Sequence, residues 1–220
     1  MASLPVPSAK ASKLPPSVDA AWESMGGGPS DLYFPDSFLG EWDITSELTS
    51  VEKLMGDEFI PNPAAVERAI NEDLNRHTRY KVSFVRGPND KVIFDRRFNT
   101  ATLVGMYYPG THRLQRAHRT DFNERIVWNM ADPNVLLLSL PGGTSIRTRV
   151  TRRSATTPAD DRLETSEFFE QIFDDAQNPP RLKANQCFTK FKWRDEAVAA
   201  KQGGPSIVAT QLLCIAHTRL

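Results

Sequence analysis

The sequence predicts a mainly β protein, an antiparallel barrel or sandwich of about eight strands with roughly two or three short helices. Three observations support this prediction. Apolar and polar residues alternate along many short stretches, which is typical of strands with one buried face. Turn-forming residues, such as Gly-Pro-Asn-Asp at 87–90 and Pro-Gly-Gly-Thr at 141–144, separate several of these stretches. Helical periodicity is confined to short segments.

Size and composition fit a single globular domain. The chain has 220 residues, of which 40% are hydrophobic and 25% charged. Its 27 basic residues balance 27 acidic ones, and this zero net charge argues against a general nucleic-acid-binding protein. No stretch approaches the roughly 18 consecutive apolar residues of a transmembrane helix.

Residues 1–30 are expected to form an N-terminal tail without a fixed fold, and residues 31–220 the folded domain. The tail is rich in Ala, Ser, Pro and Lys and lacks the apolar stretch of a secretory signal. Its composition fits a transit-peptide remnant, a mature tail left after removal of that peptide, or an ordinary disordered tail. The run Gly-Gly-Gly-Pro at 26–29 marks the boundary.

The first elements of the domain alternate between strand and helix. Residues 39–48 predict a half-buried strand because Trp42 shares one face with other apolar residues. Asn62 and Pro63 are typical of an N-cap and a first helical residue, so residues 64–74 predict a short amphipathic helix. Further strands are predicted at 80–85, 91–94, 114–119, 125–130 and 135–140, and a short helix at 98–108.

The C-terminal part predicts three more strands, at 145–153, 182–193 and 206–217. In the first of these, Arg147, Arg149 and Arg153 share one face, opposite the apolar face. Residues 165–173 predict a helical turn or two, because Thr or Ser at the start is a good N-cap.

The tripeptide Gly40-Glu41-Trp42 resembles the Gly-x-Trp motif that marks the first strand of lipocalins. The resemblance implies that Gly40 and Trp42 are structural, with the indole closing the base of a barrel beneath a basic side chain from the last strand. Arg219 is the nearest candidate for that side chain, with His217 and Lys192 behind it. The Thr-Asp-Tyr partner motif of lipocalins is missing, which leaves the broader calycin group.

Longer blocks resemble an uncharacterised lipocalin-like domain family of cyanobacteria and chloroplasts, over roughly residues 31–217. These blocks are FPDSFLGEWDITSEL, DRRFNTATL, LPGGTSIRTRVTRRS and ETSEFFEQIF. The resemblance implies a chloroplast protein associated with the thylakoid or its lumen. At the level of fold it also implies similarity to the lyases that attach bilin chromophores. It implies no defined reaction and no set of catalytic residues.

Arg147 and Arg149 are the candidate ligand-binding residues, because two guanidinium forks on one strand face suit carboxylates or phosphates. If that face lines a barrel, the pair would hold the propionates of a tetrapyrrole or an acidic lipid head. If it faces outward, the pair forms a solvated basic stripe. Trp42 and Trp128 are the aromatic residues expected beside the ligand, although large aromatic side chains also leave little room in a small barrel.

Three functions follow as hypotheses. The first is a non-enzymatic thylakoid protein that binds a pigment such as a carotenoid, a tetrapyrrole or a lipid in the barrel. The second is an auxiliary or assembly factor that binds a photosynthetic complex through its outer surface. The third is a bilin lyase, which needs an inward-facing acid such as Glu41, Asp43 or Asp95. No motif for a metal or a catalytic nucleophile is found in the sequence.

The two cysteines leave two alternatives open. If the last two strands form a hairpin centred near residue 200, Cys187 lies opposite Cys214, within reach of a disulfide in an oxidising compartment. A register shift of one residue would place the two thiols on opposite faces of the sheet and leave them free.

Overall fold

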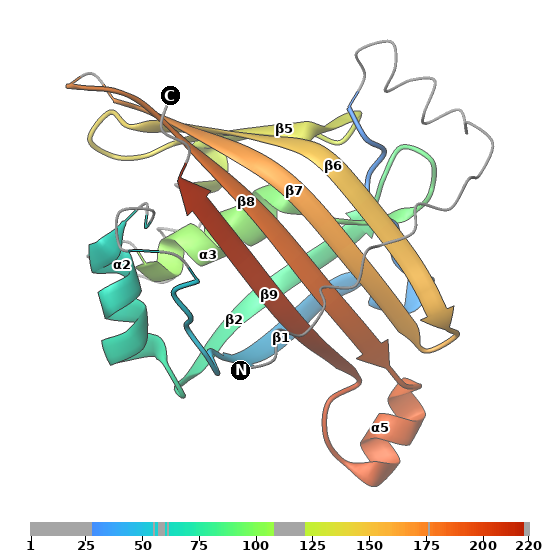
Figure 1. The fold of residues 1–220 in the computed structure, drawn as a ribbon. Coiled ribbons are helices and arrows are strands. Elements are labelled where there is room, and N and C mark those ends of the chain that lie inside the picture. The colour runs from blue at the N-terminus through green and yellow to red at the C-terminus, as the bar shows by residue number, and fades with distance from the viewer. Residues whose placement is uncertain are drawn as a thin grey trace, which may run out of the picture.

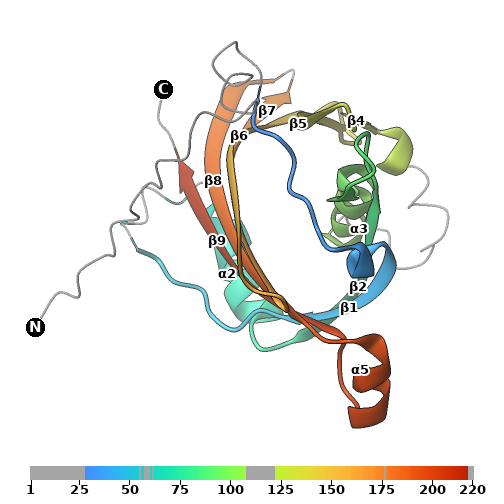
Figure 2. The same cartoon turned by 90° about the vertical axis from the view of Figure 1, so that its right-hand side faces the viewer.

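The computed structural model describes residues 28–54, 56, 60, 62–107, 122–175 and 177–217. Within these residues the protein is mainly β, with one three-stranded and one six-stranded antiparallel sheet. The six-stranded sheet curves over the three-stranded sheet and helix α3, and the two sheets enclose the interior (Figures 1 and 2). The mainly β, antiparallel prediction is confirmed, but the described strands form two sheets and not one closed barrel of eight strands.

The strand order is β1-β2-β3 in one sheet and β4-β5-β6-β7-β8-β9 in the other. The strands are β1 Gly40–Glu47, β2 His77–Arg86, β3 Val92–Phe94, β4 Ile126–Asn129, β5 Asp132–Ser139, β6 Ser145–Ala159, β7 Arg162–Asp175, β8 Asn178–Trp193 and β9 Ile207–His217. The helical elements are η1 Asp36–Phe38, α2 Pro63–Arg68, η3 Ala69–Asp73, α3 Arg96–Tyr107 and α5 Glu196–Gln202.

Gly40 begins β1 in a backbone conformation that other residues rarely adopt. Its φ is +114°, and a Cβ added there would meet no atom within 4 Å. Glycine is therefore required by the backbone and not by a lack of space, which agrees with a structural role for this residue. The alternating burial of β1, with Trp42 on the half-buried side, confirms the predicted strand.

The two predicted N-terminal helices are confirmed. Asn62 accepts a hydrogen bond from the backbone N–H of Ala65 at 3.2 Å, and Pro63 is the first residue of α2. The helix continues into the wider turn of η3, which ends at Asp73. The helix predicted at 98–108 is α3. The strand predicted at 114–119 lies outside the described residues.

Helix α3 is hydrogen-bonded to both sheets. The buried Asn99 acts like a strand backbone: its Oδ1 accepts from the N–H of Ser83 at 2.7 Å, and its Nδ2 donates to the Ser83 carbonyl at 2.8 Å. Arg97 Nε donates to the carbonyl of Ile126 at 3.1 Å. These contacts fix α3 to β2 and to β4.

The helix predicted at 165–173 is wrong. Residues 165–173 belong to β7, which pairs with β6 on one side and β8 on the other. Pairing on both edges satisfies the backbone of this segment, and that outweighs a local capping signal. The connection between β8 and β9 contains α5, whose first turn is capped by Asp195 accepting from Ala197 N–H at 2.8 Å.

Apolar side chains gather in two separate places. One cluster packs α3 against β4 and β5 around Ala101, Ile126 and Leu138, with Trp128 at its margin. The other, the aromatic cluster, consists of Phe34, Phe38, Phe84, Phe94, Phe191 and Trp193, whose rings meet mostly edge to face. Between these two apolar clusters, the inner face of the six-stranded sheet carries polar side chains.

Candidate ligand-binding site

Polar side chains cover the inner face of the six-stranded sheet between the two apolar clusters. Gln171 of β7 donates from Nε2 to Thr148 Oγ1 of β6 at 3.4 Å and accepts at Oε1 from Asn185 Nδ2 of β8 at 3.3 Å. Asn185 is only 4% exposed, so this amide lies inside the protein. Hydrogen-bonded side chains thus connect three strands at a depth where a packed core would be apolar.

The polar surface continues towards the edge of the sheet. Thr165 Oγ1 donates to the carbonyl of Thr189 at 3.5 Å, and Gln211 Nε2 of β9 donates to Thr189 Oγ1 at 3.3 Å. Thr165 and Thr189 are buried, whereas Gln211 is exposed at the open edge. Together we call these side chains the inner polar row: Thr148, Thr165, Gln171, Asn185, Thr189 and Gln211.

A cation and aromatic rings flank the inner polar row. Lys183 lies opposite Gln171 in the ladder, and its Nζ is 4.5 Å from the centroid of the Phe173 ring. Phe169 lies on the same face, opposite Asn185. Partial burial lowers the pKa of Lys183, and the charge of Arg181 lowers it further. An anion beside Lys183 would oppose both effects, so this position suits an acidic group.

A buried ionic cluster lies next to the row and consists of Asp31, Arg96, Arg153 and Glu167. Arg153 Nε and Arg96 Nη2 each lie 2.7 Å from Glu167 Oε1, and Arg96 Nη2 lies 2.9 Å from Asp31 Oδ1. The side chain of Arg153 is 2% exposed and that of Asp31 6%. Two positive and two negative charges balance, which is the condition for burying them.

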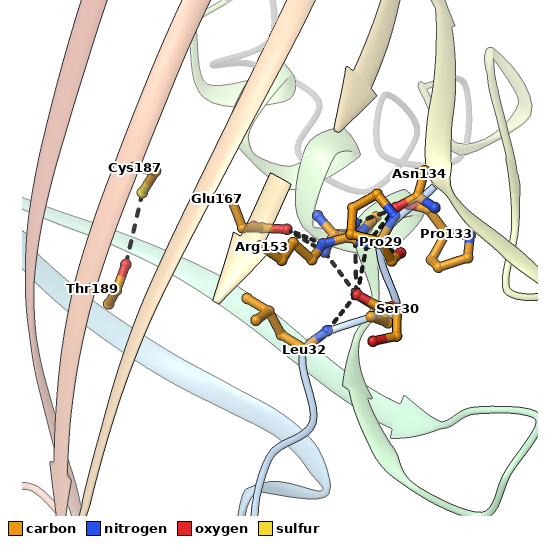
Figure 3. Close-up of polar contacts among 11 residues, drawn as sticks. Pro29, Ser30, Leu32, Pro133, Asn134, Arg153, Glu167, Cys187 and Thr189 are labelled. Atoms are coloured by element: carbon orange, nitrogen blue, oxygen red, sulfur yellow. Dashed lines mark hydrogen bonds and ion pairs between the residues drawn. The ribbon is translucent and has the colours of Figure 1, made fainter. Parts of the chain in front are cut away.

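Arg153 also holds the residues that enter the domain, which we call the strap, residues 28–34. Its Nη1 donates to the carbonyls of Pro29 and Ser30, both at 3.2 Å, and to Oδ1 of Asn134 (Figure 3). The strap then crosses the space between the two sheets towards β1 (Figure 2). The folded part therefore includes residues 28–30, which were expected in the tail.

Electrostatics keeps the ionic cluster charged. Burial alone would raise the pKa of Glu167, but the charges of Arg96 and Arg153 and their hydrogen bonds outweigh it, and the pKa lies below its ordinary value. Burial likewise opposes the charge on Arg96, yet Glu167 and Asp31 raise its pKa. The cluster connects strap, helix and sheet, and within the described residues Asp31 Oδ2 and Arg96 Nε are buried without a hydrogen-bond partner.

A β-bulge explains why Arg153 faces inward. Val150 pairs with Phe169 and Arg152 pairs with Phe168, so Thr151 is an extra residue in β6. One extra residue moves every following side chain to the other face. Strict alternation placed Arg153 with Arg147 and Arg149, and the structure corrects that prediction.

The predicted ligand residues do not come together. Arg147 and Arg149 are exposed on the outer face of β6, which is the solvated alternative. Trp42 packs against the aromatic cluster and Trp128 against the other apolar cluster. The inner polar row was missed because residues 165–173 were read as a helix. The alternation of Thr165, Glu167, Phe169, Gln171 and Phe173 was the signal that could have found it.

A basic side chain from the last strand was expected above the Trp42 indole. Trp42 donates from Nε1 to the carbonyl of Phe38 at 2.6 Å, and it lines a hollow of about 430 Å³ together with Trp193 and Arg194. Arg194 follows β8 and is the basic residue near the indole. Arg219 lies outside the described residues, and β9 begins beside Trp42 with Ile207 and runs away from it. The hollow contains no member of the inner polar row.

The carboxylates considered for a lyase face elsewhere. Glu41 is exposed, and Asp43 is exposed and paired with Lys81 at 3.1 Å. Asp95 caps α3 by accepting from Phe98 N–H at 2.9 Å. Within the described ranges, no three His, Cys, Asp or Glu side chains form a group that would hold a metal ion, and no helix is long and apolar enough to cross a bilayer.

The cysteine register differs by one residue from the predicted one. Cys187 lies opposite Leu213, and Cys214 lies opposite Gln186, so the two thiols are on opposite faces of the sheet and both are free. Burial raises the pKa of the Cys187 thiol, and a contact with Thr189 Oγ1 at 3.7 Å offsets this only in part.

Comparison with known proteins places the chain in a family. It belongs to the family described as a domain of unknown function, DUF6816, whose model matches residues 26–218. No curated protein and no solved structure matches the chain.

Proposed function

We propose that this chain is a non-enzymatic protein that holds one small ligand against the inner face of its six-stranded sheet. The fold would then be a calycin-type barrel left open at one side, working in the thylakoid as the sequence resemblance implies. The observation that carries the proposal is the inner polar row. Its ligand would combine an apolar body with an acidic group, as lipids and tetrapyrroles do.

Polar groups in a protein interior are costly unless they are hydrogen-bonded. A chain that needed only a stable core would place apolar side chains between the two apolar clusters, at the buried Asn185 and the half-buried Thr148 and Gln171. Instead these side chains bond one another at 3.3–3.4 Å and present hydroxyl and amide groups to the interior. A few convergent polar groups beside apolar walls are typical of small-molecule sites.

The flanking residues define the ligand class. Phe169 and Phe173 supply flat apolar surfaces on the same face, and Lys183 supplies a positive charge at the end of the row. Binding of a carboxylate there would stabilise the ammonium that burial and Arg181 destabilise. Arg147 and Arg149 have no part in this site, because they face outward.

A charge-removing variant tests the assignment. The probe is 1-anilinonaphthalene-8-sulfonate, an apolar anion, and the full chain is titrated by fluorescence. Lys183→Gln is expected to weaken probe binding by about tenfold, the effect of one modest charge pair. Lys190→Gln is the matched control, because Lys190 lies on the same strand but on the outer face, paired with Glu164 at 3.1 Å. Equal binding by wild type and Lys183→Gln would contradict this site.

The natural ligand is sought by isolating the full chain from a photosynthetic host and measuring its native mass and absorption spectrum. A mass above that of the chain by several hundred daltons supports the proposal, since lipids and pigments fall in this range. Visible absorption would identify a pigment. A bare mass and no anionic-probe binding would together argue against a ligand-binding function.

A second candidate function is an auxiliary factor that binds a photosynthetic complex through its outer surface. The observation that favours it is the exposure of Arg147 and Arg149 beside exposed apolar residues such as Ile172 on the outer face. Co-purification from thylakoid extracts tests it. The double variant Arg147→Ala, Arg149→Ala should lose the captured complex, whereas Lys183→Gln should keep it.

A further inference from the structure

Strand β9 forms one edge of the six-stranded sheet (Figure 1). It pairs with β8 along its full length, from Ile207 opposite Trp193 to His217 opposite Lys183, without a register shift. In the part of the chain that the structure describes, no backbone pairs with the second edge of β9. Such an edge presents a row of N–H and C=O groups that only another strand satisfies in full.

This edge lacks the features by which proteins prevent sheets from pairing. Its sequence, IVATQLLCIAH, contains no charged residue and no proline. Its 11 residues are about twice the usual length of a strand. Long, uncharged edges associate with other strands unless something covers them.

Apolar side chains of β9 are exposed on both faces of the sheet. On the outer face, Val208 is 53% and Leu212 60% exposed, and on the inner face Leu213 is 48% and Ile215 52% exposed. Leu212 lies directly opposite Phe188 of β8, which is itself 39% exposed. The unpaired backbone of β9 and its exposed apolar side chains would therefore both suit an extended apolar strand as the binding partner.

We propose that a second copy of this chain docks antiparallel on β9 about a two-fold axis, so that the two six-stranded sheets become one continuous sheet. Full overlap of two antiparallel copies of Ile207–His217 places the middle residue, Leu212, on the axis. Thr210 then faces Cys214 of the other copy, and Gln211 faces Leu213. No like charges meet, and the two Leu212 and two Phe188 side chains form one apolar cluster.

The sequence favours a second copy over the N-terminal residues of the same chain. Pro5, Pro7, Pro15 and Pro16 interrupt that segment, and each proline removes a donor from a ladder. A symmetric pair of β9 strands has no such interruption. The proposal does not rest on ligand binding, because it is argued from the unpaired backbone and the exposed apolar side chains of β9.

Sedimentation equilibrium of the full chain over a wide concentration range tests the proposal. The wild type is expected to be dimeric. Leu212→Lys and Leu212→Glu, each alone, should weaken the dimer by at least about tenfold, because two like charges would meet on the axis. An equimolar mixture of the two variants should restore the dimer. Leu137→Lys, an exposed residue of the outer face on β5, is the matched control and should leave the mass unchanged.

Each result decides the question. A monomer at every concentration, or a dimer that neither Leu212 variant weakens, overturns the proposal. Hydrogen exchange of the wild type gives a measurement that needs no variant: amides in residues 207–217 should exchange faster on dilution below the dimer dissociation constant. Exchange in this strand that does not change with concentration also overturns it.

Discussion

The aromatic cluster around Phe38 and the ionic cluster around Arg153 are both buried, and both contact the strap, but they stabilise the protein by different means. The strap contributes Phe34 to the first and Asp31 to the second. Ring contacts depend on area and shape and are insensitive to pH. Charged hydrogen bonds depend on direction and on the protonation of every member. The same short segment is thus attached once by packing and once by charge.

The largest expected effect comes from removing the centre of the ionic cluster. Arg153→Ala removes one of the two guanidinium partners of Glu167 and the donor to the strap carbonyls of Pro29 and Ser30. It should cost about 3–5 kcal/mol of unfolding free energy in urea titrations. Arg149→Ala, on the same strand before the bulge, is the control and should stay within about 0.5 kcal/mol. Equal costs for the two variants would show that the inward turn of Arg153 contributes nothing.

The pH dependence separates the two clusters. The pKa of Glu167 is lowered in the folded protein, so its contribution is complete above its ordinary pKa of 4.5 and is lost as the pH falls below that value. Glu167→Gln should cost about 1–3 kcal/mol at neutral pH, the penalty for unmatched buried donors. The difference between wild type and variant should shrink as the pH falls below 4.5. A constant difference would contradict this electrostatic account.

The aromatic cluster should respond less, and without pH dependence. Phe38→Leu removes part of a ring that is 1% exposed and should cost about 1–2 kcal/mol, less than the roughly 3–5 kcal/mol of truncation to alanine. The difference from wild type should be the same at pH 7 and at pH 4. A pH-dependent cost would mean that the two clusters are coupled through the strap.

Sequence patterns correctly predicted the elements that depend on interactions between residues close together in the chain. The cap at Asn62, the turn at 87–90 and the alternation around Trp42 depend on neighbouring residues, and each is confirmed. Residues 165–173 became a strand because two distant partners satisfy their backbone. No local pattern contains that information.

The prediction of the candidate site was wrong because it assumed an uninterrupted strand register. The extra residue at Thr151 turns Arg153 inward while Arg147 and Arg149 stay outside, and a shift of one position separates Cys187 from Cys214. Because side chains alternate with a period of two, each shift reverses the face on which a residue lies. The spacing of the arginines in the sequence does not reveal the bulge in β6, and this bulge decides which face of the sheet Arg153 occupies.

The strap has a consequence for the order in which the molecule assembles. Its Ser30 carbonyl bonds Arg153, a residue 123 positions later, and Arg153 is itself held by Glu167 of β7. During synthesis the strap leaves the ribosome early, but its binding site exists only after β6 and β7 have been made and paired. Long loops close slowly, and contacts of high sequence separation form late. The first residues of the domain to be synthesised are therefore among the last to find their place.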